Sequence, residues 1–429
     1  MDDSPFFLSV FLSFFRNTRI PIFHSPSLPP RSPLRMLLLP PTSRCLSAFS
    51  LRNSNRVRCL VHPSSPILRP RNSRTHSGME LRAVVSALEK LAPPSLAESW
   101  DNVGLLVEPS LPLIVRSMLL TNDLTEAVLE EALAKKADFI LSYHPPIFKA
   151  LKRLRSTGGW KERVIVKALE GRVAVYSPHT ACDCVSGGVN DWLAKAIGPA
   201  SVSPLSHSLS AQFPGAWAHR LEFSVGSEMD LGSILAELNS LQGAAVHSHT
   251  ARSSSGEQTR VSVNCTAPAL TQTMQLLSRE SAIYRTLQVL QLSKPPIPDA
   301  GPGRMCTLND PVTIATAVQR IKTHLRLSHV RLALGAHCTL DSLVKSMAVC
   351  AGSGSSVLNG VAADLYLTGE MSHHDVLDAV AVGTSVVLCD HSNSERGFLS
   401  ELREALTGQL QGKVEVQLSE TDRDPLEIV

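Results

Sequence analysis

Three short apolar runs, far apart in the chain, each lead directly into histidine or acidic residues. The residues that follow them are His144 after the first run, His179 and Asp183 after the second, and His391 and Glu395 after the third. Each run has the length of a buried β-strand, and in open α/β sheets ligands bind beyond the carboxyl ends of the strands. We therefore expect these side chains to meet at one edge of a sheet. A divalent metal ion is the simplest occupant of such a group of imidazoles and carboxylates.

The sequence from residue 79 onward alternates in the manner of an α/β protein. Apolar, strand-like segments alternate with amphipathic segments of about ten residues, a rhythm that predicts βαβ units and a mainly parallel sheet. The clearest segments of the first part are a helix at 81–91, strands at 114–121, 139–143 and 173–177, and helices at 124–136 and 162–169.

A central segment, residues 201–295, interrupts this alternation. Its predicted order is strand, helix, strand, strand, helix, strand, which is a ferredoxin-like (βαββαβ) unit. Prolines and glycines mark its end, and the α/β rhythm then resumes. We therefore predict a split α/β domain with halves at 79–200 and 296–429, divided by a ferredoxin-like insertion. The candidate ligands fall on both sides of the insertion, so the two halves must meet for the site to form.

The first 78 residues differ in composition from the rest. Residues 1–79 contain eleven Arg, two Asp and neither Lys nor Glu, a charge of +9, and they are rich in Ser and Pro. This composition is typical of a mitochondrial transit peptide, so we predict a disordered leader over 1–78. The alternative is a disordered tail that carries no targeting signal. Translation could also start at Met36, or at Met79 to give a cytosolic form. The expected compartments are the mitochondrion and the cytoplasm, with the nucleus as a further candidate.

The charge of the remainder limits the classes of partner. The whole chain carries +3, so residues 80–429 carry −6, which argues against nucleic-acid binding through net charge. The early apolar run, residues 6–15, is about half as long as the roughly 20 residues that a membrane-spanning helix needs, so we expect no membrane anchor. The nine cysteines are scattered without a CxxC pair, which is typical of free thiols in a reducing compartment.

The spacing of the candidate ligands is compatible with metal binding but leaves alternatives open. His391 and Glu395 are four residues apart and can converge on one ion, or Glu395 can cap a helix. Zinc, iron and manganese accept imidazole and carboxylate ligands, whereas calcium needs more oxygens. Asp183 could bridge two metals or cap a helix, and His179 could be a ligand or orient one. His144, which precedes two prolines, reads as a loop histidine when taken alone.

Two further motifs could contribute to a site. His373 and His374 follow a serine that is a plausible N-cap, so at most one of these adjacent residues would reach the site. We favour general acid–base catalysis or substrate contact over metal ligation for them, and histidines at a helix start without a role remain the alternative. The turn Gly352-Ser353-Gly354 is similar to an anion-binding loop but lacks the lysine of a P-loop. Tight strand-to-helix packing explains this turn equally well.

Six motifs together carry a family resemblance. They are Trp100-Asp101-Asn102-Val103-Gly104, Tyr143-His144-Pro145-Pro146-Ile147-Phe148, His179-Thr180-x-x-Asp183, Gly187-Gly188-Val189-Asn190-Asp191, Gly369-Glu370-Met371-Ser372-His373-His374 and His391-x-x-x-Glu395. In this order they resemble the NIF-three-like family (Ngg-interacting factor three), whose bacterial members are often described as GTP cyclohydrolase 1 type 2 homologues. The resemblance runs from about residue 79 to the C-terminus.

The resemblance implies an α/β fold of two similar halves, a homo-oligomer (a ring-shaped hexamer in bacterial relatives) and a dinuclear metal site facing an interior cavity. Carried over to this chain, the ligands would be His144, Asp183, His391 and Glu395. The bacterial pattern has two adjacent histidines where this chain has Tyr143-His144. The lost imidazole would weaken or abolish the second metal position, because a phenol with a reference pKa near 10 is a poor substitute. We therefore expect one or two divalent ions per subunit.

Two functions are consistent with this reading. The first is a metal-dependent hydrolase in which a metal-bound water attacks a nucleotide or other phosphorylated heterocycle, while His373 or His374 transfers a proton. The substrate class is implied by the resemblance alone. The second is a non-catalytic, metal-stabilised oligomer that acts as a protein-interaction scaffold or transcriptional co-regulator. The family's name refers to an interaction with a partner protein. Tyr143 also favours this second function, because a metal site that has lost a histidine ligand is not required for catalysis in a scaffold.

Overall fold

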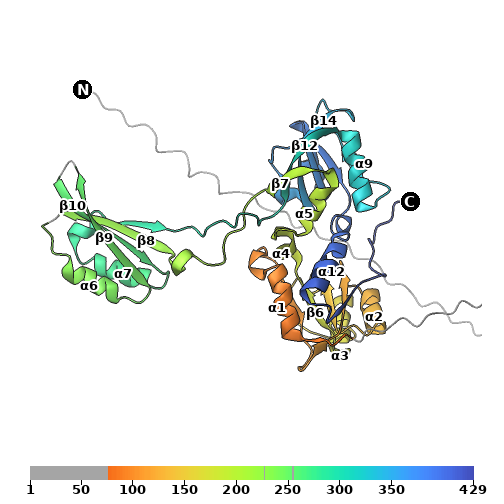
Figure 1. Cartoon of the computed structure of the whole chain (residues 1–429), viewed down its shortest axis with the longest axis horizontal. Helices are drawn as coiled ribbons and strands as arrows, with labels where there is room; N and C mark the ends of the chain where they lie inside the picture. The colour runs from red at the N-terminus through yellow and green to blue at the C-terminus, as the bar shows by residue number, and fades with distance from the viewer. Residues whose placement is uncertain (1–75, 227, 254–255) are drawn as a thin grey trace, which may run out of the picture. The chain divides into compact units, whose positions relative to one another are not determined.

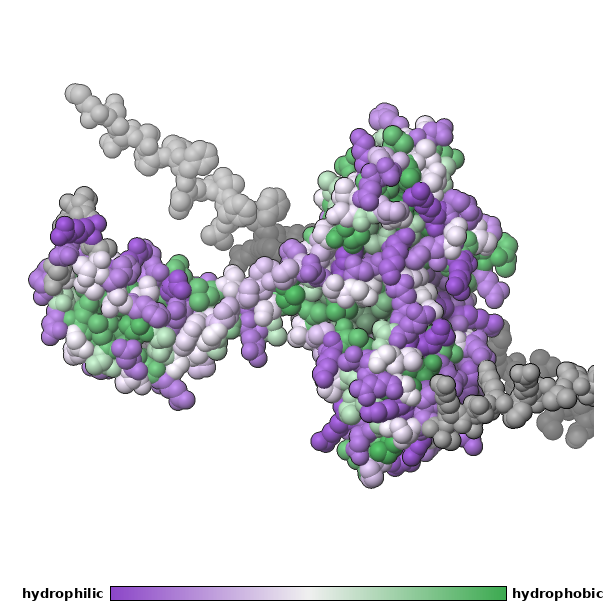
Figure 2. Space-filling model, viewed as in Figure 1, coloured by the Kyte–Doolittle hydropathy of each residue, from purple (hydrophilic) through white to green (hydrophobic). Residues whose placement is uncertain are grey.

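The computed structural model describes residues 76–429, except for 227 and 254–255. The predicted leader up to residue 75 and the candidate start at Met36 lie outside the described residues. No helix within the described part of the chain is long and apolar enough to cross a membrane. Hydrophobic residues appear in the space-filling view as separate patches between hydrophilic ones, as expected where amphipathic elements turn their polar faces outward (Figure 2).

A five-stranded sheet forms the first half of the α/β part (Figure 1). Its strands are, in sheet order, β17 (Glu415–Leu418), β4 (Ser117–Thr121), β5 (Phe139–Ser142), β6 (Ala174–Ser177) and β2 (Gly104–Val107). The first four are parallel and β2 is antiparallel to β6. The helices around it are α1 (Leu81–Leu91), α12 (Phe398–Gln409), α2 (Glu126–Ala134) and α3 (Trp160–Glu170). Because strand side chains alternate between faces, one face packs on α1 and α12 and the other on α2 and α3.

A six-stranded sheet forms the second half. Its strands are, in sheet order, β13 (Arg331–Ala333), β16 (Ser385–Leu388), β15 (Leu365–Glu370), β14 (Leu343–Ser353), β12 (Arg304–Thr313) and β7 (Ala200–Pro204). The central three strands, β16, β15 and β14, are parallel, and the outer strands are antiparallel to their neighbours. The helices that pack on it are α5 (Val189–Ala194) and α9 (Ile314–Leu325) on one face, and α10 (Ser355–Leu358) and α11 (His373–Ala381) on the other.

The two halves share strands and a core. β17, at the C-terminus of the chain, pairs with β4 of the first sheet, and β7 pairs with β12 of the second sheet. One continuous hydrophobic core runs from Leu81 of α1 to Val387 of β16 and contains residues of both halves. These pairings and the shared core hold the carboxyl ends of β5 and β16 in a single folded unit. The predicted site needs both strand ends.

The central segment forms its own four-stranded antiparallel sheet, in the order β11-β8-β10-β9. Its elements are β8 (His219–Gly226), α6 (Gly232–Ser240), β9 (Ala244–Ser253), β10 (Gly256–Cys265), α7 (Leu270–Leu277), α8 (Ser281–Tyr284) and β11 (Gln288–Gln291). Leu221, Phe223 and Val261 belong to a separate core beneath α6 and α7. The predicted fold class, a split α/β domain with a ferredoxin-like insertion, is confirmed. The ferredoxin-like elements start at β8, because β7 belongs to the six-stranded sheet.

One strand prediction needs correction. The predicted strand at 114–121 is two strands, β3 (Ile114–Val115) and β4, and β3 pairs with β1 (Met79–Glu80) instead of β5. The backbone N–H groups of Arg116 and Ser117 both donate to the carboxylate of Asp138, at 2.7 and 3.1 Å. This side-chain acceptor at the junction lets the chain change partner without leaving a donor unpaired.

Candidate metal centre

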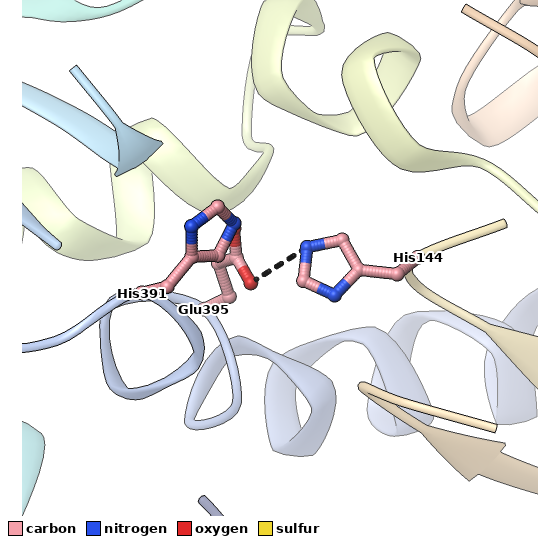
Figure 3. A group of neighbouring side chains, drawn as sticks. All are labelled: His144, His391 and Glu395. Atoms are coloured by element: carbon pink, nitrogen blue, oxygen red, sulfur yellow. Dashed lines mark ion pairs between the residues drawn. The ribbon is translucent and has the colours of Figure 1, made fainter. Parts of the chain in front are cut away.

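The ends of β5 and β16 bring three of the predicted ligands together. His144 follows β5, and His391 and Glu395 flank the short 3-10 helix η4 (Ser392–Ser394) that follows β16. His144 Nε2 lies 3.2 Å from Glu395 Oε2, and His391 Nε2 lies 3.5 Å from Glu395 Oε1. Among the described residues, these three offer ligand atoms within 4.8 Å of one another, a group that could hold a metal ion. Figure 3 shows the Glu395 carboxylate beside both imidazoles.

Glu395 is the buried centre of this group, with 3% of its surface exposed. Burial alone would raise its pKa, but the charge of His144, helped by His391 and Asn122, lowers the pKa below its ordinary value. Asn122 Nδ2 donates to Glu395 Oε2 over 3.1 Å. The carboxylate is therefore held in its charged form, which is the form that binds metal.

Each of the two imidazoles is held at Nδ1 by a further carboxylate. His144 Nδ1 lies 3.0 Å from Asp123 Oδ1, and His391 Nδ1 lies 3.1 Å from Glu370 Oε2. A proton on Nδ1 that is donated to a carboxylate leaves the Nε2 lone pair for a metal. Burial opposes the protonation of His144, but Glu395 and Asp123 outweigh it and raise the pKa to about 10, so an ion that binds Nε2 near neutral pH displaces a proton from it. Sequence reasoning missed both carboxylates, although both lie at strand ends, after β4 and on β15.

The residues present fit a divalent ion. His144 Nε2 is buried and makes no hydrogen bond of acceptable geometry to the described residues, although Glu395 is near. An unpaired buried polar atom is costly, and a cation shared with the carboxylate would satisfy both groups. Gly352, with φ +65°, leaves the room, because a Cβ there would lie 2.7 Å from Glu395 Oε1 and 3.1 Å from His391 Nε2. Two imidazoles and a carboxylate suit zinc, iron or manganese.

Asp183, the fourth predicted ligand, is bonded to Tyr143. It lies in α4 (His179–Cys184) and accepts a hydrogen bond from the Tyr143 hydroxyl. Burial raises the pKa of Asp183 to about 6. Burial and the charge of Asp183 raise the pKa of Tyr143 well above its ordinary value. Tyr143 is therefore a neutral hydrogen-bond donor and not a phenolate, and neither residue belongs to the group formed by His144, His391 and Glu395.

His179 lies next to this group and is anchored in the same way. Its Nδ1 atom lies 2.8 Å from Asp101 Oδ1, and its ring centroid is 5.3 Å from that of His144. The residue has φ +29°, which is uncommon for a residue with a side chain, and strained backbone of this kind clusters at active sites and ligand clamps. His179 is thus a third imidazole whose Nδ1 atom is held by a carboxylate.

The candidate ligands border a cavity of about 910 Å³. All four predicted ligands and His179 line it, together with Trp100, Phe148 and Lys161. The Trp100 and Phe148 side chains are 60% and 43% exposed, and their ring centroids lie 6.0 Å apart. Aromatic faces at the wall of a cavity can stack on a planar ring, and a nearby ammonium group can neutralise an anion.

The two histidines with a predicted catalytic role lie outside the lining of this cavity. His373 and His374 begin α11, are exposed, and have ring centroids 5.5 Å apart. Neither is among the described residues that line the cavity. Their place is explained by helix capping, because Ser372 accepts a hydrogen bond from Asp375 N and starts the helix just before them.

The predicted anion-binding turn lies at the cavity but its amides are engaged. Gly352 and Ser353 line the cavity. Gly352 N donates to Ser394 Oγ over 2.7 Å, and Gly354 N donates to the carbonyl oxygen of Glu370 over 3.1 Å. These two donors are therefore unavailable to an anion, and the turn instead brings the backbone close to the ligands.

Sequence reasoning also missed the C-terminal tail. Asp422 Oδ2 accepts from Asn122 N over 2.7 Å, and Arg396 Nη2 lies 3.2 Å from Asp422 Oδ1. Ser392 Oγ donates to Asp424 Oδ2 over 3.0 Å, and Asp424 lines the cavity. The tail thus ties the loop after β4 to the loop after β16. No motif could reveal such contacts, since Asn122 and Asp422 are 300 positions apart.

Comparisons with known proteins agree with this architecture. A family model described as Duf34/NIF3 (NGG1p interacting factor 3) matches residues 79–425. The chain is 54% identical over 355 residues to human NIF3-like protein 1, covering 83% of this chain and 94% of the human protein. It is 30% identical over 368 residues to NGG1-interacting factor 3 of Saccharomyces cerevisiae, covering 83% and 99%. The solved structure of Staphylococcus aureus protein SA1388 shares the fold, with a TM-score of 0.59, 24% identity, and coverage of 82% and 99%.

The matched range includes both halves of the α/β part, the central insertion and every candidate ligand. The motifs that resemble this family at the level of sequence are the segments that surround the cavity in the structure, since Trp100, His144, Asp183 and His391 all line it. The chain therefore belongs to the Duf34/NIF3 (NGG1p interacting factor 3) family.

Proposed function

We propose that this protein is a metal-dependent hydrolase, and that His144, His391 and Glu395 hold one divalent ion of zinc, iron or manganese. The observation that carries the proposal is the convergence of two imidazole Nε2 atoms on one buried carboxylate, with each Nδ1 atom held by another carboxylate. When bound, the ion would supply Lewis acidity that lowers the pKa of a water molecule, which can then act as a nucleophile near neutral pH. Three protein ligands are typical of catalytic zinc sites, whereas structural sites have four.

The remaining residues position the ligands. Asp123 and Glu370 hold protons on the imidazole Nδ1 atoms, so that both rings keep one tautomer and one orientation. Asn122 directs Glu395 through its side-chain amide, and the tail residue Asp422 fixes the backbone of Asn122. These contacts hold the ligand atoms in place before an ion or substrate arrives, which reduces the reorganisation needed for binding.

The proposed substrate is a nucleotide or another phosphorylated heterocycle. Trp100 and Phe148 offer aromatic faces to a planar ring, and Trp100 lies 6.1 Å from His179, which neighbours His144. Lys161, on the same cavity wall, offers a positive charge to a phosphate group. The volume of about 910 Å³ is at the upper end of the range for small-molecule sites, roughly 300–1,000 Å³.

A second candidate, a non-catalytic metal-stabilised oligomer that acts as a protein-interaction scaffold or transcriptional co-regulator, is favoured by one observation. The Tyr143 hydroxyl is bonded to Asp183, so one predicted ligand already has a partner that needs no ion. The yeast relative is named for an interaction with NGG1. Homo-oligomerisation, including the hexamer implied by the family resemblance, belongs to this candidate and can be measured by light scattering.

Elemental analysis of the purified protein, combined with a hydrolysis screen over nucleotides, tests the proposal. We expect one metal equivalent per chain, its loss in His391→Ala, and loss of hydrolysis in the same variant. His329→Ala is the matched control, because it removes an exposed histidine that does not line the cavity and should keep both metal and activity. A metal-loaded protein that hydrolyses no nucleotide would favour the scaffold. A parent protein that binds none of the three metals would refute the proposed site.

A further inference from the structure

A second cavity borders α4 and does not include the candidate metal ligands. It has a volume of about 180 Å³ and is lined by residues of α1, α12 and the carboxyl ends of β5 and β6. No described residue lines both cavities. The division is clearest within α4, where Cys182 lines the smaller cavity and the next residue, Asp183, lines the larger one. The smaller cavity is thus separate from the site proposed above.

The wall of this cavity is largely apolar. Its polar side chains are Ser186 and Glu401, which reach solvent, and the buried Tyr176. Leu88 and Leu91 of α1 and Leu402 and Ala405 of α12 supply much of the surface. Tyr176, which is 1% exposed, also lines the cavity, and its hydroxyl has no hydrogen-bond partner among the described residues. Buried hydroxyl groups almost always have a partner, and an unpaired one is destabilising. The Tyr176 hydroxyl is therefore suited to bind a polar atom of a ligand.

We infer that this cavity binds a compact, uncharged aromatic compound that carries one hydrogen-bond acceptor, of the aryl ketone, aldehyde or amide class. The volume of the cavity limits the size of the ligand. An apolar cavity of about 150 Å³ is known to take up benzene, and the cavity beside α4 is slightly larger. Charge sets a second limit, because the described lining contains no Lys, Arg or His to pair with an anion. Its one acid, Glu401, is already paired with Lys195 at 2.7 Å, which leaves no free charge for a cation.

The acceptor follows from the chemistry of the phenol. A phenolic hydroxyl donates its proton more readily than it accepts one, because its oxygen lone pair is delocalised into the ring. Burial raises the pKa of Tyr176, so the group stays protonated and able to donate across the accessible pH range. A carbonyl oxygen is the simplest matching acceptor, while the ring of the ligand would pack against the leucines of α1 and α12.

A pair of fluorinated probes of almost equal shape tests the inference on the full chain. They are 4-fluoroacetophenone, which has the carbonyl oxygen, and 1-ethyl-4-fluorobenzene, which lacks it, and fluorine NMR measures the dissociation constant of each. We expect the ketone to bind about 2- to 10-fold more tightly, which corresponds to the net value of one hydrogen bond. Tyr176→Phe removes only the hydroxyl and should abolish this preference while the ethyl compound still binds.

A second variant keeps the test informative if Tyr176→Phe alters the packing. Ala405 is exposed on α12 at the wall of the cavity, so Ala405→Trp should fill the space without disturbing the core and should abolish binding of both probes. The inference is overturned if neither probe binds the parent protein at millimolar concentration, if the preference for the ketone survives Tyr176→Phe, or if Ala405→Trp still binds both. Metal content is unaffected by any of these results, so the test is independent of the proposed hydrolase.

Discussion

Glu131 of α2 anchors the C-terminal tail, and replacing it with glutamine should destabilise the protein in a pH-dependent way. Its two carboxylate oxygens accept hydrogen bonds from Lys135 Nζ at 2.7 Å, Ser419 Oγ at 2.6 Å, Glu420 N at 2.9 Å and Thr421 N at 3.1 Å. The side chain is 9% exposed. Burial alone would raise its pKa, but the four donors outweigh burial and lower the pKa from 4.5 to about 2.

The size of the effect follows from this difference in pKa between the folded and the unfolded chain. Because each pKa unit corresponds to roughly 1.4 kcal/mol, the carboxylate contributes on the order of 3 kcal/mol to the free energy of unfolding at pH 7. A depressed pKa means that this contribution is fully present above pH 4.5 and is lost as the pH falls through 2. At pH 3 roughly 1.5 kcal/mol should remain. Glu131→Gln removes the charge at every pH, so the gap between parent and variant should narrow by about half between pH 7 and pH 3.

Urea unfolding of both proteins at pH 7 and pH 3, in the presence of a chelator, measures this gap. The chelator removes any contribution from metal binding, which has its own pH dependence. Glu130→Gln is the matched control: Glu130 is the neighbouring acid on α2, 66% exposed, and paired with Lys167 at 3.1 Å. Exposed pairs are worth about 0–1 kcal/mol, so the control should stay close to the parent. A gap for Glu131→Gln that is below 1 kcal/mol at pH 7, or that does not change with pH, would refute the reasoning.

Two predictions concern the candidate metal centre. Asp123→Asn should weaken zinc binding by roughly 10- to 100-fold in a calorimetric titration, because the carboxylate no longer holds the proton on His144 Nδ1; unchanged affinity would show that the carboxylate does not orient the ring. Gly352→Ala should lower the metal content of the purified protein, because its new Cβ would lie 2.7 Å from Glu395 Oε1. Gly360→Ala is the control, since Gly360 has a similar φ of +76° with no atom within 4 Å, and equal metal content in the two variants would contradict this explanation.

The sequence predicted the fold class and the convergence of three ligands for one physical reason. Apolar runs of strand length are local features, and the rule that parallel strands present their carboxyl ends at one edge is general. His144, His391 and Glu395 follow β5 and β16 directly, so the rule applies to them without knowledge of the tertiary contacts. The same rule does not predict that β17 joins the first sheet and β7 joins the second. Both are short strands, and their partners depend on how the two halves pack.

The partners of the ligands were harder to predict than the ligands themselves. A metal ligand is restricted to a few residue types, whereas an acceptor for an imidazole N–H can be almost any oxygen that the fold brings near. Asp123, Glu370 and Asp422 are ordinary acids in sequence and become specific only through neighbours 21 to 300 positions away. The catalytic role of His373 and His374 stays a prediction. They are conspicuous as a pair, but their position follows from helix capping, and their exposed side chains do not line the cavity.

Tyr143 accounts for the difference between four predicted ligands and three that converge. A histidine at this position would offer a lone pair to a metal, whereas the phenol, 0% exposed, offers a proton, and Asp183 accepts it. Donor and acceptor thus satisfy each other within the protein, so neither is left unpaired when no ion is bound. An ion at a second position would have to compete with this hydrogen bond and would have one imidazole fewer to bind it. By contrast, His144 Nε2 makes no hydrogen bond of acceptable geometry to a described residue, although Glu395 Oε2 lies 3.2 Å away. The two positions implied by the family resemblance are therefore unequal in this chain, and the one formed by His144, His391 and Glu395 is the one that gains from an ion.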